Sequence, residues 1–523
     1  MKNNFKLLLI VAASFVACSK TDTAPAGVEE PIVITSGTAD FSKYVALGNS
    51  LTAGYADGAL YKAGQQNSWT KILSDQFKLA GGGEFKIPYT NDNFGGVLAG
   101  GNIILDNRLY FDLEAKGLKR LSTVDYRPTT EIGVPLVGPF NNMGVPGAKS
   151  FHLFAPGYGN IQYLSLGKSN PYFIRFASAP NATIVADAAA QAPTFFTLWI
   201  GNNDVLSYAT SGGTGNPLTG ADPSLYGGND ITNPAVFANV YENIIKTMGA
   251  AGAKGGAVAN IPNITTIPFF TTIKYNQLTQ ANLTVDGVNQ IAKLNTQLYG
   301  PLSQVLTAIG QPDRVKPLSA TGNNPLLIRD VSLVNKAQEI TAVLIQLGYP
   351  TPTAGAFGAI FGQARQTTAE DYVLLTTSTA IGAAPTVAEV GFTPPAGLDK
   401  YGITFPLLDK HVLSKTEVMN IESAATQYNT SIKTLADTYN LAFVDARATM
   451  ENLYVSGFSY ENLILKSDLV FGGAFSLDGV HPTSRGNALI ANEFSKAINA
   501  KYGSNLPAVK LSNYPILMPK EIK

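Results

Sequence analysis

The sequence predicts an α/β fold in which short buried strands alternate with longer amphipathic helices. From Phe41 onward, short apolar runs are followed by segments whose apolar residues recur at helical spacing, which is the pattern of strand–helix units packed in layers. Residues 195–200 (FFTLWI) are apolar except for one threonine, as expected of a parallel strand that is covered on both faces. Hydrophobic residues make up 45% of the 523 positions, so the chain can build a large core.

The expected elements follow from these patterns in chain order. The helix at 68–80 has its apolar residues at helical spacing and ends at three glycines, 81–83. Another helix begins with Ser414 and Glu417, which have the spacing of a capping box. In full, we expect strands at 44–47, 195–200, 256–261 and 441–445, and helices at 68–80, 234–248, 414–439 and 484–502.

Two segments do not follow this pattern. Residues 82–140 contain short apolar runs typical of β-hairpins, at 85–89, 102–105 and 109–113. Residues 265–412 combine Gly-, Pro- and Thr-rich loops such as 348–355 with helical pieces, at 290–298 and 333–347. We interpret both segments as insertions into one domain at 39–505, because the motifs described below lie on both sides of them. Residues 506–523 are expected to form a C-terminal tail.

The composition excludes several classes of function. Lys plus Arg and Asp plus Glu are equal, at 37 each, so no net positive field favours binding to nucleic acid. The three histidines do not stand at ligand spacing and there is a single cysteine, so neither a metal site nor a disulfide is predicted. The sequence has no glycine-rich phosphate loop. We therefore expect no cofactor and no nucleic-acid partner.

The N-terminal residues have the pattern of an export signal. Two lysines precede an apolar run at 7–17, which is shorter than the roughly 20 residues needed to span a bilayer. Cys18 follows directly, at the position where a bacterial lipoprotein signal places its acylated cysteine. We therefore predict a signal peptide at 1–17, lipidation at Cys18 and a polar tether at 18–38. The alternative is an ordinary signal peptide with an incidental cysteine.

Three residues that are far apart in the sequence have the chemistry of an activated serine. Asp478 stands three residues before His481 on a loop that leads into a helix, so its carboxylate can accept the imidazole Nδ1–H. Ser50 follows the first predicted strand in a glycine-flanked turn, and side chains at such strand ends gather at the carboxyl edge of a parallel sheet. In the alternative interpretation, Ser50 caps a helix and His481 is a structural histidine beside a capping aspartate.

Four short blocks stand in a fixed order along the chain: 48–51 (GNSL), 142–147 (NMGVPG), 201–204 (GNND) and 478–481 (DGVH). In this order they resemble the SGNH, or GDSL, hydrolase family of esterases and lipases. The resemblance covers about half of the mature chain and implies a three-layer α/β/α sandwich with a mostly parallel central sheet, with the two insertions outside it. Asn49 replaces the aspartate that is usual in the family, at a position outside the family's catalytic triad.

The resemblance also implies a role for each site residue. Ser50 would be the nucleophile, His481 its general base, and Asp478 the residue that orients the histidine. The N–H groups of Ser50 and Gly147 and the side-chain amide of Asn203 would form the oxyanion hole. Taken alone, Gly147 would be a turn glycine and Asn203 one of several asparagines in a polar turn.

Other polar residues near these blocks receive no chemical role. Gly201 and Asp204 are expected to support the loop that carries Asn203. His152 and His411 have no carboxylate partner at short range. We expect His152 to pack near the pocket, and His411 to lie at the surface or in contact with an insertion.

Together these expectations describe a cell-envelope lipoprotein that hydrolyses carboxylic esters through a Ser-His-Asp acyl-enzyme mechanism. The substrate would be an acyl ester of a lipid or a carbohydrate, and the insertions, more than the catalytic blocks, would choose it. The protein would be a monomer anchored to the outer membrane through Cys18, facing either the periplasm or the cell surface. Two alternatives stay open: an O-acyltransferase with the same triad, and a non-catalytic lipoprotein that binds a glycan or another partner.

Overall fold

A parallel sheet forms the centre of the molecule. The computed structural model describes residues 33–460 and 462–522, so the predicted signal peptide, Cys18 and most of the predicted tether lie outside the described residues. The sheet has five strands, all parallel, in the spatial order β7 (Asn142–Gly144), β1 (Tyr44–Gly48), β8 (Phe195–Trp199), β9 (Gly255–Ala259) and β16 (Ala442–Val444). The prediction of an α/β fold with a mostly parallel central sheet is therefore confirmed.

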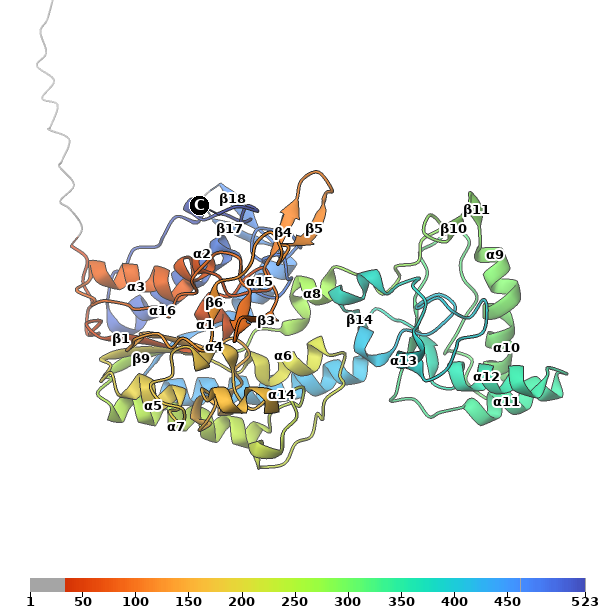
Figure 1. The fold of residues 1–523 in the computed structure, drawn as a ribbon, viewed down its shortest axis with the longest axis horizontal. Helices are drawn as coiled ribbons and strands as arrows, with labels where there is room; N and C mark the ends of the chain where they lie inside the picture. Colours follow the sequence, from red (N-terminus) through yellow and green to blue (C-terminus); the bar gives the residue numbers. More distant parts are fainter. Residues whose placement is uncertain (1–32, 461, 523) are drawn as a thin grey trace, which may run out of the picture.

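Helices cover both sides of this sheet (Figure 1). α3 (Trp69–Leu79) and α16 (Ser484–Tyr502) lie together on one side, and α5 (Ile184–Ala189), α7 (Pro234–Ala250) and α14 (Lys415–Thr438) lie on the other. Every residue of β1, β8 and β9 is buried between them. Each strand and helix expected for this part of the chain is present, within two residues at either end.

Local signals in the sequence determine where these helices begin. Ser68 caps α3 with its hydroxyl, and Ser414 and Glu417 form the capping box predicted for α14. At the start of α16, the hydroxyl of Thr483 accepts the N–H of Gly486. This cap fixes the beginning of α16 and therefore holds the loop before it, which carries the candidate histidine.

The segment at 82–140 forms small sheets of its own beside the main sheet. β2 (Val97–Ala99) pairs with β3 (Asn102–Leu105) and β6 (Thr130–Glu131), whereas β4 (Leu109–Asp112) and β5 (Gly117–Arg120) form a hairpin. Two of the three apolar runs in this segment, 102–105 and 109–113, therefore form hairpins as expected.

The strand expected at the third run, 85–89, is a wrong prediction, because this described segment has no regular strand. Phe85 and Ile87 are buried, as the pattern suggested. The backbone of Lys86, however, donates to the side chain of Asn141 and accepts its N–H. The following Pro88 has no N–H to add to a ladder. The apolar side chains thus reach the core without a partner strand.

The residues between α8 (Pro268–Thr271) and α14 form a separate lobe, at the right of Figure 1. Its hydrophobic core is distinct from the core around the sheet, and its buried residues run from Ile273 to Val412. The main elements of the lobe are β10 (Thr284–Val285), β11 (Val288–Asn289), α9 (Ile291–Leu294), α10 (Gly300–Ala308), β12 (Leu327–Arg329), α11 (Ala337–Gln346), α12 (Thr351–Phe361), β13 (Ala364–Gln366), β14 (Tyr372–Val373) and α13 (Val387–Val390).

Helix α12 occupies part of a segment that was expected to be a loop. The sequence at 348–355 is rich in Gly, Pro and Thr, yet the helix starts at Thr351. Pro352 is its second residue, where no bond is lost because the first N–H groups of a helix have no intrahelical partner. Gly358 allows α12 to approach α11 closely, since a Cβ there would lie 2.4 Å from the carbonyl oxygen of Ala337.

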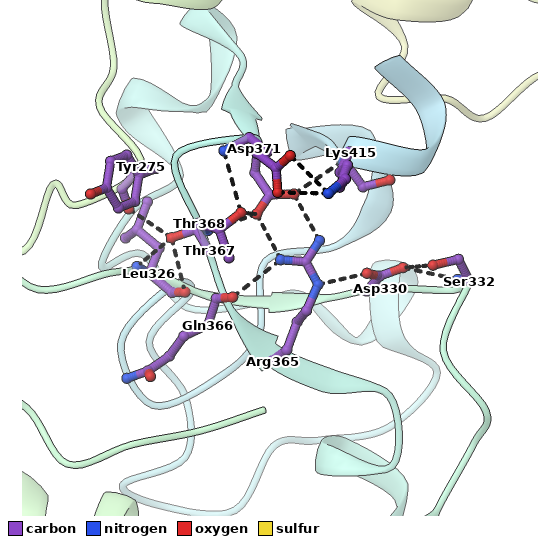
Figure 2. A network of polar contacts seen from close by, with 12 residues as sticks. Tyr275, Leu326, Asp330, Ser332, Arg365, Gln366, Thr367, Thr368, Asp371 and Lys415 are labelled. Carbon is purple, nitrogen blue, oxygen red and sulfur yellow. Dashed lines mark hydrogen bonds and ion pairs between the residues drawn. The ribbon is translucent and has the colours of Figure 1, made fainter. Parts of the chain in front are cut away.

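A buried ion pair connects this lobe to α14 (Figure 2). The two Nη atoms of Arg365 each lie 2.7 Å from a carboxylate oxygen of Asp371, and its Nε lies 2.6 Å from Asp330. The side chain of Asp371 is fully buried and also accepts the backbone N–H of Lys415, in the first turn of α14. Asp371 therefore binds both Arg365 of the lobe and the first turn of α14, the helix that leads back to the sheet.

Both ends of the described chain are packed against the body. The backbone N–H of Thr35 donates to the side chain of Asn505, so contacts reach back into the predicted tether at 18–38. At the other end, the fully buried Arg108 donates to the carbonyl oxygens of Pro519 and Lys520, so the predicted tail is attached to the body. In the part of the chain that the structure describes, no helix combines the length and the apolar character needed to cross a membrane.

Candidate active site

Ser50 lies where the strand order of the sheet changes direction. The chain passes from β1 to β7 on one side and then to β8 on the other, and such a switch point opens a crevice at the carboxyl edge of a parallel sheet. Ser50 is the first residue of the short helix α1 (Ser50–Ala53), where the side chain of Asn49 accepts the N–H of Leu51. The strand before Ser50 and the capped helix after it hold the serine at this edge.

The loop at 474–483 carries Asp478 and His481. The two sides of this loop bind each other, because the N–H of Thr483 donates to the carbonyl of Ala474 and the N–H of Ser476 donates to the carbonyl of His481. The loop is therefore closed as a hairpin before α16 begins, and it carries the two candidate side chains to the edge where Ser50 lies.

The three side chains form a continuous hydrogen-bonded line. Nε2 of His481 lies 2.8 Å from Oγ of Ser50, and Nδ1 of His481 lies 2.9 Å from Oδ2 of Asp478. Ser50 is 7% exposed, so the hydroxyl is mostly removed from water. The fold thus brings a serine and a histidine that are 431 positions apart into contact.

Asp478 is a carboxylate whose two oxygens both accept hydrogen bonds. Oδ1 accepts the N–H groups of Val480 and His481, and Oδ2 accepts the N–H of Gly58 besides the imidazole. Burial raises the pKa of this carboxyl, but the charge of His481 and the N–H donors together lower it more, to about 2. The ionised carboxylate can therefore hold the Nδ1–H tautomer of His481 and stabilise a positive charge on its ring.

The expected oxyanion-hole residues lie at the same edge of the sheet. Gly147 follows β7 with a φ of +82°, a conformation that favours glycine. Asn203, in α6 (Asn202–Thr210), donates one amide hydrogen to the carbonyl of Ala148, which leaves its second hydrogen for a substrate oxygen. Outside the helix and strand ladders, the N–H groups of Ser50 and Gly147 donate to no other described residue, so both are available as donors.

Asp204 ties together the two loops that carry these donors. Its carboxylate oxygens accept the N–H of Ser150 at 2.9 Å and the hydroxyl of Ser150 at 2.6 Å. Ser150 lies three residues after Gly147, whereas Asp204 directly follows Asn203. Asp204 is fully buried, and burial raises its pKa. This position fits the supporting role expected from the sequence.

Sequence reasoning missed three residues of the site, which are Tyr55, Asp57 and Gly58. The ring of Tyr55 packs against the imidazole of His481 with the centroids 4.6 Å apart. Gly58 donates its N–H to Asp478, 420 positions away. An Asp-Gly pair is a local turn signal, but no local pattern indicates which distant loop the turn will contact.

Asp57 is a second buried carboxylate next to the triad. It accepts the hydroxyl of Tyr61 at 2.7 Å and the N–H of Leu477 at 3.1 Å, and its own N–H donates to Oγ of Ser476 at 3.0 Å. Burial raises the pKa of this carboxyl to about 6, and the charge of Asp478 acts in the same direction. Asp57 therefore holds the backbone that leads into Asp478.

The other two histidines have packing roles. The ring of His152 stacks on Tyr158 with centroids 4.5 Å apart, and the ring of His411 packs against Tyr401 with centroids 5.2 Å apart. Burial lowers the pKa of both imidazoles to about 4, so both are neutral at pH 7. Among the described residues, no group of His, Cys, Asp or Glu side chains could hold a metal ion.

An apolar cavity of about 120 Å³ opens beside the triad. Side chains from α15 (Ala446–Val455), from α16 and from the loop after β9 form about half of its wall. Ser50, Asn203 and His481 also line it. The candidate nucleophile, its base and one oxyanion donor therefore face a single space.

Comparison with models of known protein families and with curated protein sequences finds no match. Conclusions about function therefore depend on the geometry of this site and on the motifs that form it.

Proposed function

We propose that the protein is a serine esterase of the SGNH, or GDSL, type that hydrolyses acyl esters of a lipid or a carbohydrate through an acyl-enzyme. The observation that carries this proposal is the hydrogen-bonded line from Ser50 through His481 to Asp478. A hydroxyl, an imidazole and a carboxylate in this order activate a serine for attack on a carbonyl.

The proposed fold is the three-layer α/β/α sandwich of that family. The parallel sheet, its strand order and the helices on both sides support it. We propose that 82–140 and 265–412 are insertions into this framework. The separate hydrophobic core within 273–412 supports this interpretation for the second segment.

In the acylation half of the proposed reaction, Oγ of Ser50 attacks the ester carbonyl while Nε2 of His481 takes the hydroxyl proton. The ionised carboxylate of Asp478 stabilises the imidazolium that forms. His481 then gives this proton to the leaving alcohol, and the acyl group stays on Ser50. In the second half, His481 takes a proton from water as the water attacks the acyl carbonyl, and the proton returns to Oγ of Ser50 as the acid leaves.

The carbonyl oxygen becomes an oxyanion in each half of the reaction. The proposed donors are the N–H groups of Ser50 and Gly147 and the second amide hydrogen of Asn203. Removal of one such donor commonly lowers kcat by about 10²–10³. The bonds between Asp204 and Ser150 would keep these donors in place.

Hydrolysis of p-nitrophenyl acyl esters by the purified protein tests the proposal. We expect Ser50→Ala to lower kcat by at least about 10³, and a fluorophosphonate to label Ser50. Ser456→Ala is the matched control, because Ser456 is exposed at the end of α15. Equal rates for the wild type and Ser50→Ala, or an adduct on another residue, would contradict the proposal.

We further propose that the protein is a monomeric lipoprotein of the cell envelope, anchored to the outer membrane through Cys18. The apolar run at 7–17 and the cysteine that follows it support this location. Cells fed a labelled fatty acid should incorporate label into the wild type and not into Cys18→Ser. Equal label in both proteins, or none in either, would count against the anchor.

A further inference from the structure

The cavity beside Ser50 is built by the sheet framework and not by the two proposed insertions. Among its described lining residues, only Ile267 falls within 82–140 or 265–412. Leu453 of α15 and Leu489 of α16 line it and keep exposures of 5% and 4%, as expected of core residues that border a hollow. The insertions, which are expected to choose the substrate, therefore contribute little to this cavity.

The wall of the cavity is almost entirely hydrocarbon. Away from the sheet edge its polar side chains are Thr449 and Glu493. Such a surface gains free energy when it is covered by hydrocarbon and offers few hydrogen bonds to a sugar. Its larger apolar members include Trp199, Leu206, Ile264, Met450, Phe475 and Phe494.

The surroundings of His481 outside this cavity include polar groups. Tyr55 packs on the ring of His481, and Gly58 donates its N–H to Asp478. The exposed guanidinium of Arg120 lies over Gly58, 3.8 Å from where a Cβ would stand. In the proposed reaction the bond between the carbonyl carbon and the alcohol oxygen breaks next to Nε2 of His481, since that atom gives the alcohol its proton. A polar alcohol suits the side of Tyr55 and Arg120, which leaves the apolar cavity to the acyl chain.

We infer that the apolar cavity is an acyl-chain pocket and that the natural acyl group is a hydrocarbon chain of several carbons. The inference rests on the proposed function and names the substrate class of that site. A single water needs a cavity of about 10–15 Å³. The cavity beside Ser50 has about 120 Å³. A methylene is similar in size to water, so the cavity has room for several methylene groups of a chain.

Two series of esters test this assignment on the whole chain. In the first, p-nitrophenyl esters from acetyl to palmitoyl vary the acyl chain. Each buried methylene is worth about fourfold, so kcat/KM should rise by at least about 10²-fold from acetyl to octanoyl and should stop rising once the chain is longer than the cavity. In the second series, acetate esters from methyl to octyl vary the alcohol, and kcat/KM should change by less than about threefold. A larger gain along the alcohol series than along the acyl series would overturn the inference.

Filling the cavity provides the second test. Ala446 and Thr449 line it from α15, whereas Ala448 is exposed on the same helix. Ala446→Phe and Thr449→Phe should each lower the ratio of octanoyl to acetyl kcat/KM by at least about tenfold. Ala448→Phe, the matched control, should leave this ratio unchanged. If both cavity variants fold and keep the wild-type ratio, the chain does not enter this cavity and the inference is wrong.

A binding measurement separates failure of the inference from failure of the proposed function. Sodium decanoate, titrated into Ser50→Ala in a calorimeter, should bind, and the added Ala446→Phe substitution should weaken binding by at least about tenfold. If no ester is hydrolysed in a Ser50-dependent way but decanoate binds and Ala446→Phe blocks it, the esterase proposal fails and the pocket assignment stands. Hydrolysis without chain selectivity and without decanoate binding would overturn only the pocket assignment.

Discussion

At the residue scale, two neighbouring buried carboxylates have pKa values shifted in opposite directions, because they receive different numbers of hydrogen bonds. Asp478 receives N–H groups from three residues and faces His481, and its pKa is lowered to about 2. Asp57 receives one phenol and one N–H, and burial raises its pKa to about 6. Only Asp478 is therefore a permanent negative partner for a charged imidazole.

Replacing Asp478 by Asn should lower kcat for ester hydrolysis by about 10⁴. An amide in this place can still accept the N–H groups of Val480 and His481, but it favours the wrong imidazole tautomer. The rate of p-nitrophenyl ester hydrolysis between pH 6 and 9 measures the loss. Asp468→Asn is a control because Asp468 is exposed on the segment before the triad loop. A loss smaller than tenfold would remove Asp478 from the proposed mechanism.

Asp57 should make the free energy of unfolding depend on pH. Its pKa is about 6 in the folded protein against 3.8 as the reference for the unfolded chain. Its contribution to stability is therefore fully present below pH 3.8 and is lost as the pH rises through 6. The loss amounts to about 3 kcal/mol. In urea unfolding from pH 4 to pH 8, the stability of the wild type relative to Asp57→Asn should fall by about this amount; a constant difference would contradict the raised pKa.

At the element scale, local signals determined which predictions were right. The helices α3 and α14 start where Ser68 and Ser414 cap them, and such caps act within one turn. The two errors depended on long-range contacts. The segment at 85–89 binds Asn141 instead of a strand, and α12 packs against α11 through Gly358, so neither outcome is visible in the local pattern.

Replacing Arg365 by Met should destabilise the lobe at 273–412, because the buried Asp330 and Asp371 would keep their charges without a partner. Loss of one member of a buried pair costs about 3–5 kcal/mol. Hydrogen exchange should accelerate in β12 and β13 more than in β1 and β8. Glu370→Gln is the control, since its ion pair with Lys415 is exposed and should contribute less than about 1 kcal/mol. Equal protection in the Arg365 variant and the wild type would contradict the expectation.

At the scale of the whole molecule, the sequence indicated the three side chains of the proposed triad but not the residues that support them. Ser50, His481 and Asp478 stood out because each lies in a short pattern with a chemical meaning. Tyr55 and Asp57 lie five and seven residues after Ser50 and received no role. Their contacts reach the triad loop more than 400 positions away, and only the folded topology determines such contacts.

Removing residues 517–523 should lower the thermal unfolding temperature. The fully buried Arg108 would lose the carbonyl oxygens of Pro519 and Lys520, and each bond from a charged donor is worth about 1.5–3 kcal/mol. Lys520→Ala is the matched control because it keeps the backbone carbonyl. Calorimetry should show a lower Tm for the truncated chain than for Lys520→Ala. The same Tm in both would mean that Arg108 finds other acceptors.

The separation of 431 positions between Ser50 and His481 has a consequence for the cell that makes this protein. A ribosome adds about 5–20 residues per second, so the serine emerges on the order of twenty to ninety seconds before its base. Throughout that interval the hydroxyl has no imidazole to activate it. In the proposed mechanism, a nascent or prematurely ended polypeptide would therefore not attack the esters of its own host, and reactivity would arise only once synthesis is almost complete.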